Sequence, residues 1–353
     1  MNKSTKTIFI ITILLLLNVG AIYPADYEGG RDWMILPPSA RAAGMGRALV
    51  AIVDNANTVF WNPGGITFLE GLNISYNYEP KHMRFLGDFE IHNMSLSKKL
   101  KSVYFIGFNV RREYENKRRY RDSDIGISFG YNENDFGIGI TTKFLYSKPK
   151  KYILHKGELI KSKNPSFAAD IGVLYSKDYG IKNGYMLQVN VGSSLLNISK
   201  GIKFTDYTEW GIPCIFRLGY ALKLITPKGE GKLKWLTIAN NLEYLNIMNR
   251  DRNKTEWNYL SLGCGFEFAV YEILFFRIGY HYQRDYFYSK SFNHPYYKGH
   301  TYGLGICLPV NYINKSLPLS ITYDFAQFPW DLKSEFKKER YFLIHSLNFN
   351  YKF

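Results

Sequence analysis

The stretch of sequence that decides the fold is YFLIHSLNFNYKF, residues 341–353. Every second residue from Tyr341 to Phe353 is apolar or aromatic except His345, while the opposite positions end in Ser346, Asn348, Asn350 and Lys352. Because strand side chains alternate between two faces, this pattern gives one apolar and one polar face. A strand of this kind favours lipid on one side and a polar interior on the other, as in a membrane-spanning β-barrel.

The terminal aromatic residues predict how such a barrel is assembled. A final phenylalanine resembles the signal by which bacterial barrels are recognised for insertion into the outer membrane. Phe349, Tyr351 and Phe353 are therefore expected to form an assembly signal that is read by the outer-membrane barrel assembly machinery.

The amino-terminal residues predict export from the cytoplasm. Lys3 and Lys6 precede an apolar run over 8–17, and Val19-Gly20-Ala21 offers small residues for a signal-peptidase cut. A membrane anchor is the alternative, but the run is shorter than the roughly 20 apolar residues that a spanning helix needs. We expect residues 1–21 to be a cleaved signal peptide and the protein to reside in the bacterial outer membrane.

The remaining chain divides into segments of period two that are separated by turn residues. In one of them, Ile125, Ile127, Phe129 and Tyr131 alternate with glycine and serine. Fourteen strands are predicted, at 71–80, 89–98, 101–111, 121–131, 135–146, 166–177, 184–194, 213–224, 233–245, 256–269, 272–283, 299–309, 317–326 and 341–353. Their length of about ten residues suits a tilted transmembrane strand.

The connections between these strands are predicted to alternate in length. Those at 99–100, 132–134, 178–183, 225–232, 270–271 and 310–316 are short, whereas those at 81–88, 112–120, 147–165, 195–212, 246–255, 284–298 and 327–340 are longer. Outer-membrane barrels have short periplasmic turns and longer external loops. Both ends of the barrel are therefore expected to face the periplasm.

Composition agrees with an exported barrel. Aromatic residues make up 17% of the chain, which suits interfacial girdles, and mean hydropathy is only −0.23 because apolar residues occupy alternate positions. The net charge of +15 points to anionic lipid rather than nucleic acid in an exported chain. The basic loops have two interpretations, a solvated rim or contact with glycolipid phosphates.

Six charged residues fall on the polar face of the predicted strands. They are Lys143, Asp170, Arg217, Glu267, Arg277 and Asp324. A Lys or Arg facing lipid at the bilayer midplane costs about 2–4 kcal/mol, so these residues are expected inside the barrel. We predict a lumen charge network that holds an internal plug.

Residues 22–70 precede the strands and differ in character. Small residues from Ala40 to Ala48 permit close packing, a short helix is expected over Arg47–Val53, and Asn62-Pro63-Gly64-Gly65 indicates a compact turn. Gly44-Met45-Gly46 does not fit a dinucleotide-binding loop, because no strand precedes it and Leu49 replaces the third glycine. We predict a hatch that plugs the periplasmic mouth of a barrel formed by residues 71–353.

Residues 39–65 resemble the hatch of the PorV/PorQ family, a branch of the FadL-like outer-membrane barrels. The residues that carry the resemblance include Ala40-Arg41-Ala42, Gly44-Met45-Gly46 and Trp61-Asn62-Pro63-Gly64-Gly65, and further blocks lie at 170–175, 217–220, 277–280 and 323–326. Gly65 and Asn55 depart from the usual family residues. The resemblance implies a fourteen-stranded barrel whose gating residues are Gly44, Met45, Gly46, Trp61, Asn62, Pro63, Gly64 and Gly65.

The same resemblance implies two alternative functions. FadL-type members pass long-chain fatty acids or other hydrophobic molecules through a gated lumen, which is the function we favour. PorV instead serves type IX secretion by binding secreted cargo proteins at the cell surface. The histidines show no nucleophile motif beside them, so no catalytic residue, enzymatic activity, metal site or cofactor is predicted.

Overall fold

The computed structural model describes residues 34–53, 55–83, 87–115, 120–149, 154–155, 158–159, 165–199, 202–203, 209–210, 212–227, 233–247, 257–285, 298–310, 313–314, 316–330 and 340–352. The predicted signal peptide, Phe353 and most of the basic loop residues lie outside these ranges. Among the described residues, no helix is long and apolar enough to cross a membrane.

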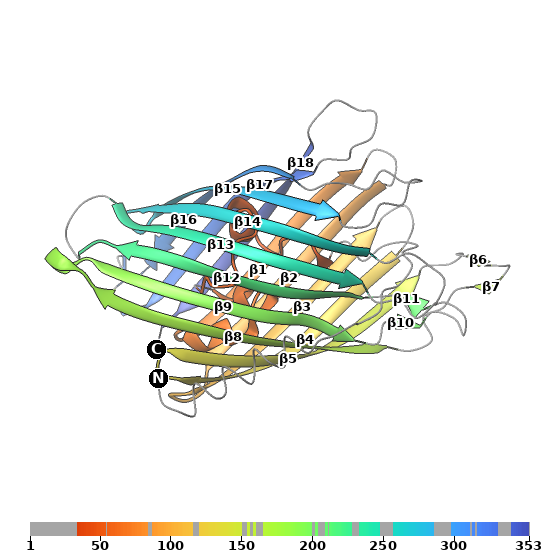
Figure 1. Ribbon diagram of the computed structural model, residues 1–353, viewed down its shortest axis with the longest axis horizontal. Helices are drawn as coiled ribbons and strands as arrows, with labels where there is room; N and C mark the ends of the chain where they lie inside the picture. Colours follow the sequence, from red (N-terminus) through yellow and green to blue (C-terminus); the bar gives the residue numbers. More distant parts are fainter. Residues whose placement is uncertain are drawn as a thin grey trace.

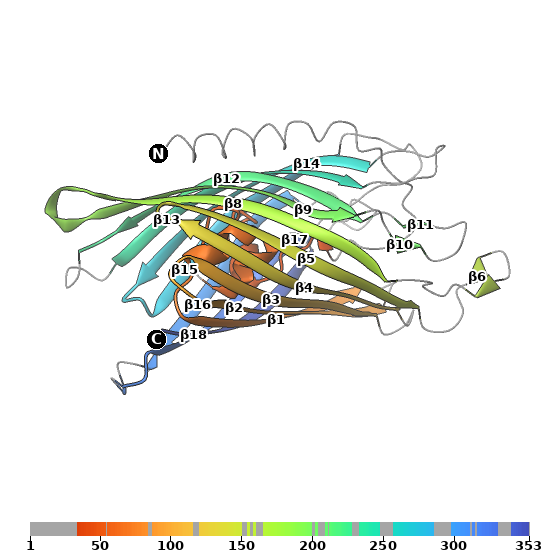
Figure 2. The same cartoon turned by 90° about the horizontal axis from the view of Figure 1, so that it is seen from below.

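Fourteen antiparallel strands close into one barrel, which confirms the predicted fold class and strand number. The strands are β1 (Leu72–Met83), β2 (Gly87–Lys99), β3 (Tyr104–Glu115), β4 (Tyr120–Glu133), β5 (Phe136–Pro149), β8 (Ser166–Gly180), β9 (Met186–Ser199), β12 (Pro213–Ile225), β13 (Leu233–Ile247), β14 (Trp257–Val270), β15 (Leu274–Asp285), β16 (Lys298–Pro309), β17 (Leu319–Trp330) and β18 (Arg340–Tyr351). Each pairs with its sequence neighbours among these fourteen, and β1 pairs with β18 to close the cylinder (Figures 1 and 2).

The barrel has two different ends. The turn end carries the connections at 100–103, 134–135, 181–185, 226–232, 271–273 and 310–318, and the hairpin of β8 and β9 extends farthest there, at the left of Figure 1. The loop end carries the other connections, including two short ribbons, β6 (Leu154–His155) with β7 (Glu158–Leu159) and β10 (Ile202–Lys203) with β11 (Glu209–Trp210).

The prediction that every loop-end connection is long was wrong for the first two. β1 continues to Met83 and pairs with Gly87, which leaves only residues 84–86 between the strands, and β3 and β4 leave only 116–119. The apolar alternation stops in both segments: residues 112–120 are mostly charged, and residues 81–88 mix charged and apolar residues without a period of two, so the predicted strands ended there. The backbone pairing continues past that point because a ladder needs no apolar side chains.

The outer face of the barrel is apolar along its whole circumference, as a membrane-spanning barrel requires. Phe129, Ile140 and Phe167 are 58%, 56% and 64% exposed, and the residues on either side of Phe129 and Ile140 point inward and are buried. On this face the Tyr76 hydroxyl lies 2.8 Å from His92 Nδ1, and the Tyr323 hydroxyl lies 2.8 Å from His345 Nδ1. His345 therefore has the outward orientation predicted from its position in the last strand.

The last strand itself shows the predicted alternation. Ser346 and Asn348 point inward and are buried, whereas Leu347 and Phe349 point outward. Phe349 lies opposite Ile74 and Ile321, and Tyr351 lies opposite Leu72 and Leu319, so both belong to the seam that closes the barrel.

Residues 34–70, here called the hatch, fill the inside of the barrel (the orange segment in Figures 1 and 2). They form one short α-helix, α2 (Ala40–Gly44), and two 3-10 helices, η2 (Ala56–Phe60) and η3 (Pro63–Phe68). Met34 and Leu36 lie toward the loop end, where their carbonyls accept hydrogen bonds from Arg111, and Gly71 reaches Tyr351 at the turn end. The hatch therefore extends through much of the barrel and is not confined to one mouth.

The helix predicted over Arg47–Val53 was wrong, because the helix lies upstream at Ala40–Gly44. Ser39 caps its amino terminus by accepting a hydrogen bond from the Ala42 amide, and the chain then turns sharply. Gly46 and Arg47 both adopt positive φ, +60° and +68°, and a residue in that region cannot continue a right-handed helix.

Candidate functional site

The candidate site is the contact between the hatch and the barrel wall. All six charged residues that the sequence placed in the lumen point inward there and are buried. Lys143 Nζ lies 2.8 Å from Asp170 Oδ2, and Arg277 lies between Glu267 and Asp324 at 2.6 Å from each. Arg217 pairs with Glu243 rather than with another member of the predicted set.

Arg41 of α2 joins the hatch to one part of this network. Its Nη2 and Nε atoms donate to the two carboxylate oxygens of Glu267 at 2.6 and 2.8 Å. Glu267 also accepts a 2.6 Å hydrogen bond from Arg277 Nε, and Asp324 accepts from Arg277 Nη1. Bidentate arginine–carboxylate pairs are directional as well as strong, so this contact fixes the position of α2 against the wall.

Arg47 joins the hatch to a second part of the network. Its Nη2 donates to Glu243 Oε1 at 2.6 Å, and Arg217 Nε donates to the other oxygen of Glu243 at 2.6 Å. The Arg217 guanidinium also lies over the ring of Trp61, 4.2 Å from its centroid. Trp61 is completely buried, and its backbone carbonyl accepts a hydrogen bond from Ser194 of β9.

The predicted gating residues Gly44, Met45 and Gly46 lie against β14, β15 and β16. The Thr301 hydroxyl of β16 donates to the Gly44 carbonyl at 3.0 Å, and the Thr301 hydroxyl oxygen accepts from the Gly46 amide at 3.1 Å. A side chain at Gly46 would meet the carbonyl oxygens of Cys264 and Tyr280 at 2.5 and 2.6 Å. Met45 is fully buried in the apolar part of the hatch.

The predicted turn Asn62-Pro63-Gly64-Gly65 begins the helix η3. Asn62 is the cap, since its side-chain oxygen accepts from the Gly64 amide at 3.0 Å. Its amide nitrogen donates to the carbonyls of Val50 and of Val173 in β8, at 2.9 and 2.8 Å. One buried asparagine side chain therefore joins two hatch segments to the wall.

Inward-facing glycines let the hatch backbone lie directly against the wall. The argument is clearest at Gly64, where an added Cβ would lie 2.7 Å from the Gly172 carbonyl oxygen of β8. A Cβ on any of these wall glycines would lie closer to a hatch atom than ordinary contact distance allows: Gly137, Gly139, Gly172, Gly192, Gly263, Gly265, Gly279 and Gly303. Only glycine permits such backbone approach, so the wall and the hatch are matched surfaces.

Above the charged residues, toward the loop end, the barrel interior becomes apolar on five strands. On β5 and β13, Leu145 and Leu245 follow Lys143 and Glu243 on the inner face. The other members of this layer are Ile91 of β2, Phe328 of β17 and Ile344 of β18, and all five are completely or almost completely buried. Met34 and Leu36 of the hatch pack with four of these five residues, and Leu245 packs in a separate cluster with Ile35 of the hatch.

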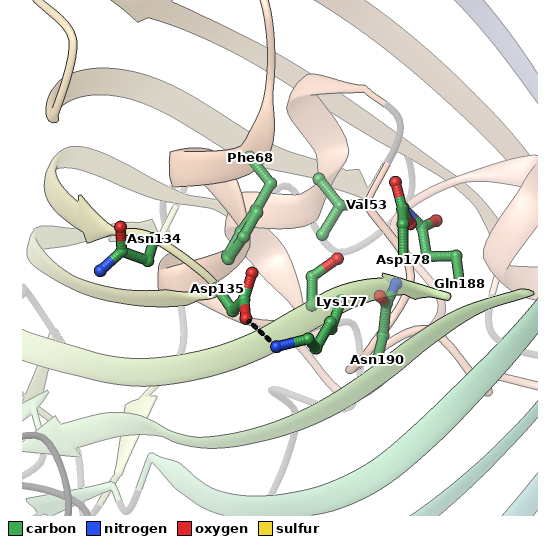
Figure 3. Close-up of a pocket in the computed structure, with 9 residues that line it drawn as sticks. Val53, Phe68, Asn134, Asp135, Lys177, Asp178, Gln188 and Asn190 are labelled. Carbon is green, nitrogen blue, oxygen red and sulfur yellow. Dashed lines mark hydrogen bonds and ion pairs between the residues drawn. The ribbon is translucent and has the colours of Figure 1, made fainter. Parts of the chain in front are cut away.

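A pocket of about 410 Å³ lies below the hatch at the turn end (Figure 3). Val53 and Phe68 of the hatch form one side, and polar residues of β8, β9 and the 134–135 turn form the other. Lys177 Nζ lies 2.9 Å from Asp135 Oδ2, and Figure 3 marks this ion pair with a dashed line among the residues that line the pocket. The two sides of the hatch therefore differ. The side toward the loop end meets the apolar layer together with the buried Arg111, and the side toward the turn end meets a polar vestibule.

Sequence reasoning missed three members of the network, Arg41, Arg47 and Glu243. Glu243 could have been found, because it lies directly opposite Arg217 in the register of β12 and β13. The two hatch arginines belong to an irregular segment, where no periodicity indicates which way a side chain points. Among the described residues, no group of three or more histidine, cysteine, aspartate or glutamate side chains is arranged to hold a metal ion.

Comparison with known proteins identifies the fold. No protein-family model and no curated protein sequence matches this chain. The solved CymD monoaromatic hydrocarbon channel is similar with a TM-score of 0.52 and 10% identity, covering 89% of this chain and 97% of that one. The TodX deltaS2S3 mutant monoaromatic hydrocarbon channel gives the same TM-score and identity and covers 89% of this chain and 99% of that one. At this identity the likeness shows a shared barrel fold.

Proposed function

We propose that this protein is a bacterial outer-membrane channel that passes hydrophobic small molecules under control of its hatch. The apolar layer of Ile91, Leu145, Leu245, Phe328 and Ile344 carries the proposal. A barrel that conducts water and ions has a polar interior, because apolar constrictions dewet and block such solutes. The apolar layer lies beside the buried charged residues Glu79, Arg111 and Asp124 of the same half, so it forms an apolar face along the interior, and such a face favours solutes that leave water readily.

The fold shared with monoaromatic hydrocarbon channels supports a substrate of this class. CymD and TodX are monoaromatic hydrocarbon channels, and their barrel fold is similar to that of this chain. Long-chain fatty acids and aromatic hydrocarbons are both candidates, in keeping with a FadL-like barrel.

The network is arranged so that the hatch can move without leaving wall charges alone. Glu267 accepts from Arg41 of the hatch but also from Arg277 of the wall, and Glu243 accepts from Arg47 but also from Arg217. A buried carboxylate without a partner would be costly. Because each carboxylate keeps its wall arginine, movement of the hatch breaks the ion pairs of Arg41 and Arg47 but leaves neither wall carboxylate without a partner.

A disulfide between the hatch and the wall tests this gating. The Ala40 amide donates to Ser346 Oγ at 2.7 Å, so cysteines at these two positions are adjacent. In a background whose three native cysteines are changed to alanine, Ala40→Cys with Ser346→Cys should block uptake of labelled oleate and toluene by whole cells. Reduction with dithiothreitol should restore uptake.

The matched control is a disulfide that joins wall to wall. Ser166 Oγ and Ser199 Oγ on β8 and β9 lie 3.4 Å apart, and neither residue belongs to the hatch. Ser166→Cys with Ser199→Cys should leave uptake unchanged. Normal uptake by the oxidised hatch–wall variant would refute gating.

The sequence resemblance of residues 39–65 to the PorV/PorQ hatch keeps a secretion role as the competing hypothesis. A cargo-binding subunit of type IX secretion has no need of an apolar interior, which is why transport is the function proposed. Deletion of the gene separates the two. Loss of uptake supports transport, whereas intact uptake with exported cargo held in the periplasm supports secretion.

A further inference from the structure

His281 is a fully buried polar side chain on the inner face of β15. Its exposed fraction is 0%, and neither ring nitrogen has a hydrogen-bond partner among the described residues. Buried polar atoms are almost always paired, and an exception in a native fold calls for an explanation such as a bound molecule. His281 lies near Arg47 and Glu243 of the charge network but forms no ion pair with either among the described residues.

A second incompletely paired polar group lies beside it. Gln283 shares the inner face of β15 two residues farther along, is 3% exposed and keeps a buried amide oxygen without a partner. Side chains two residues apart on a strand share one face, so Gln283 and His281 are neighbours on the inner face of β15. The two residues together form a polar site on one strand.

The position of this site connects it to the apolar layer. The His281 ring packs on Phe328, with 5.5 Å between ring centroids, and Phe328 belongs to the same cluster as Met34 and Leu36 of the hatch. Two residues toward the turn end, Gly279 contacts the hatch backbone at Gly46. His281 therefore lies at the loop-end surface of the hatch, where a molecule held in the apolar layer would be in reach.

The unused atoms specify the chemistry of the partner. A neutral imidazole supplies one N–H donor and one nitrogen acceptor, and Gln283 adds an oxygen acceptor. The complement is a group that both donates and accepts. A hydroxyl does so, a carboxylate has acceptors only, and a hydrocarbon has neither.

We propose that His281 and Gln283 bind the hydroxyl group of a neutral, hydroxyl-bearing hydrophobic molecule, an alcohol or phenol, whose apolar part packs against Phe328. This inference rests on the proposed function and narrows its substrate class. The polar pair makes the site selective. A pure hydrocarbon forms no hydrogen bond with the buried donor and acceptors, and it is therefore disfavoured relative to an alcohol.

The test measures binding of three matched probes to the protein in lipid nanodiscs at pH 7.5 by isothermal titration, with empty nanodiscs subtracted. The probes are 1-decanol, decanoate and decane. The native protein is expected to bind 1-decanol about tenfold more tightly than either of the others, the worth of one or two net hydrogen bonds.

Two variants assign that preference to the site. His281→Phe keeps an aromatic ring against Phe328 but removes both nitrogens, and Gln283→Leu removes the amide. Each should weaken 1-decanol binding by about three- to tenfold and leave decane binding unchanged. The control is His300→Phe, the same substitution on the outer face of β16, where His300 packs on Tyr280; it should change nothing.

Circular dichroism and heat-modifiable migration on gels establish that each variant is a folded barrel. Equal binding of the three probes by the native protein, or an equal loss of all three in His281→Phe, would overturn the inference while leaving the proposed function intact. Binding of none of the probes would count against both.

Discussion

Gly44 of the hatch and Gly303 of β16 meet backbone to backbone: a Cβ placed on Gly44 would lie 2.9 Å from the Gly303 Cα atom. No flexible side chain is available at this contact to move aside. The backbones of the hatch and the wall are therefore in direct contact at this pair.

Substitution of Gly44 by valine should push α2 away from β16. We expect a loss of about 1–3 kcal/mol in the free energy of unfolding, the usual cost of overpacking, measured by guanidinium titration in liposomes. The control is Gly180→Val at the turn end of β8, where an added Cβ meets nothing within 4 Å. Equal losses in the two variants would contradict a close hatch–wall fit.

Removal of the charge of Glu243 should destabilise the protein strongly. Glu243→Gln leaves the guanidinium groups of Arg47 and Arg217 buried without a carboxylate, at an expected cost of about 3–5 kcal/mol in the same titration. Glu70→Gln is the matched control, because Glu70 pairs with Lys352 at 3.2 Å on the surface, with a side chain that is 70% exposed. That variant should lose less than about 1 kcal/mol.

Trp61 should matter both for its volume and for its ring. Trp61→Ala empties a completely buried site and takes away the aromatic face under Arg217, so a loss of about 3–5 kcal/mol is expected. Trp61→Phe keeps a ring beneath the guanidinium and should cost clearly less. If phenylalanine and alanine destabilise equally, the contact with Arg217 contributes nothing.

The outer face should be sensitive to charge in the middle of the strands. Ile140 of β5 is 56% exposed, and Ile140→Arg is expected to cost about 2–4 kcal/mol in liposomes because it places a cation in lipid. Ile313, which is 75% exposed in the turn-end connection between β16 and β17, provides the control. Ile313→Arg should be near neutral, and a comparable cost at both positions would argue against a lipid-facing belt.

The barrel could be predicted from sequence because each strand carries its own apolar alternation and the same pattern recurs in strand after strand. Strands such as 121–131 alternate apolar residues with glycine and serine, and each inward position follows from the parity of its strand. The lengths of the first two loop-end connections could not be predicted in this way, since β1 and β3 continue by backbone pairing alone.

The hatch was less predictable because its conformation depends on the wall. The residues 47–53 have acceptable helix propensity, yet Gly46 and Arg47 adopt positive φ where the backbone must pass Gly263 and Gly279. Tertiary contact overrides propensity there. The same reasoning explains Arg41 and Arg47, whose acidic partners lie more than 190 residues away in sequence.

The closure of β1 against β18 has a consequence for biogenesis. The hatch immediately precedes β1, and its Met34–Leu36 part lies at the far end of the cylinder from the β1 start at Leu72. If the barrel closed first, the side chains of Arg41 and Arg47 would have to pass the wall glycines that contact the hatch backbone, and there is no room for them to do so. We therefore expect the strands to close around a hatch that is already in position, so that residues 34–70 act as a template for the pairing of β1 with β18.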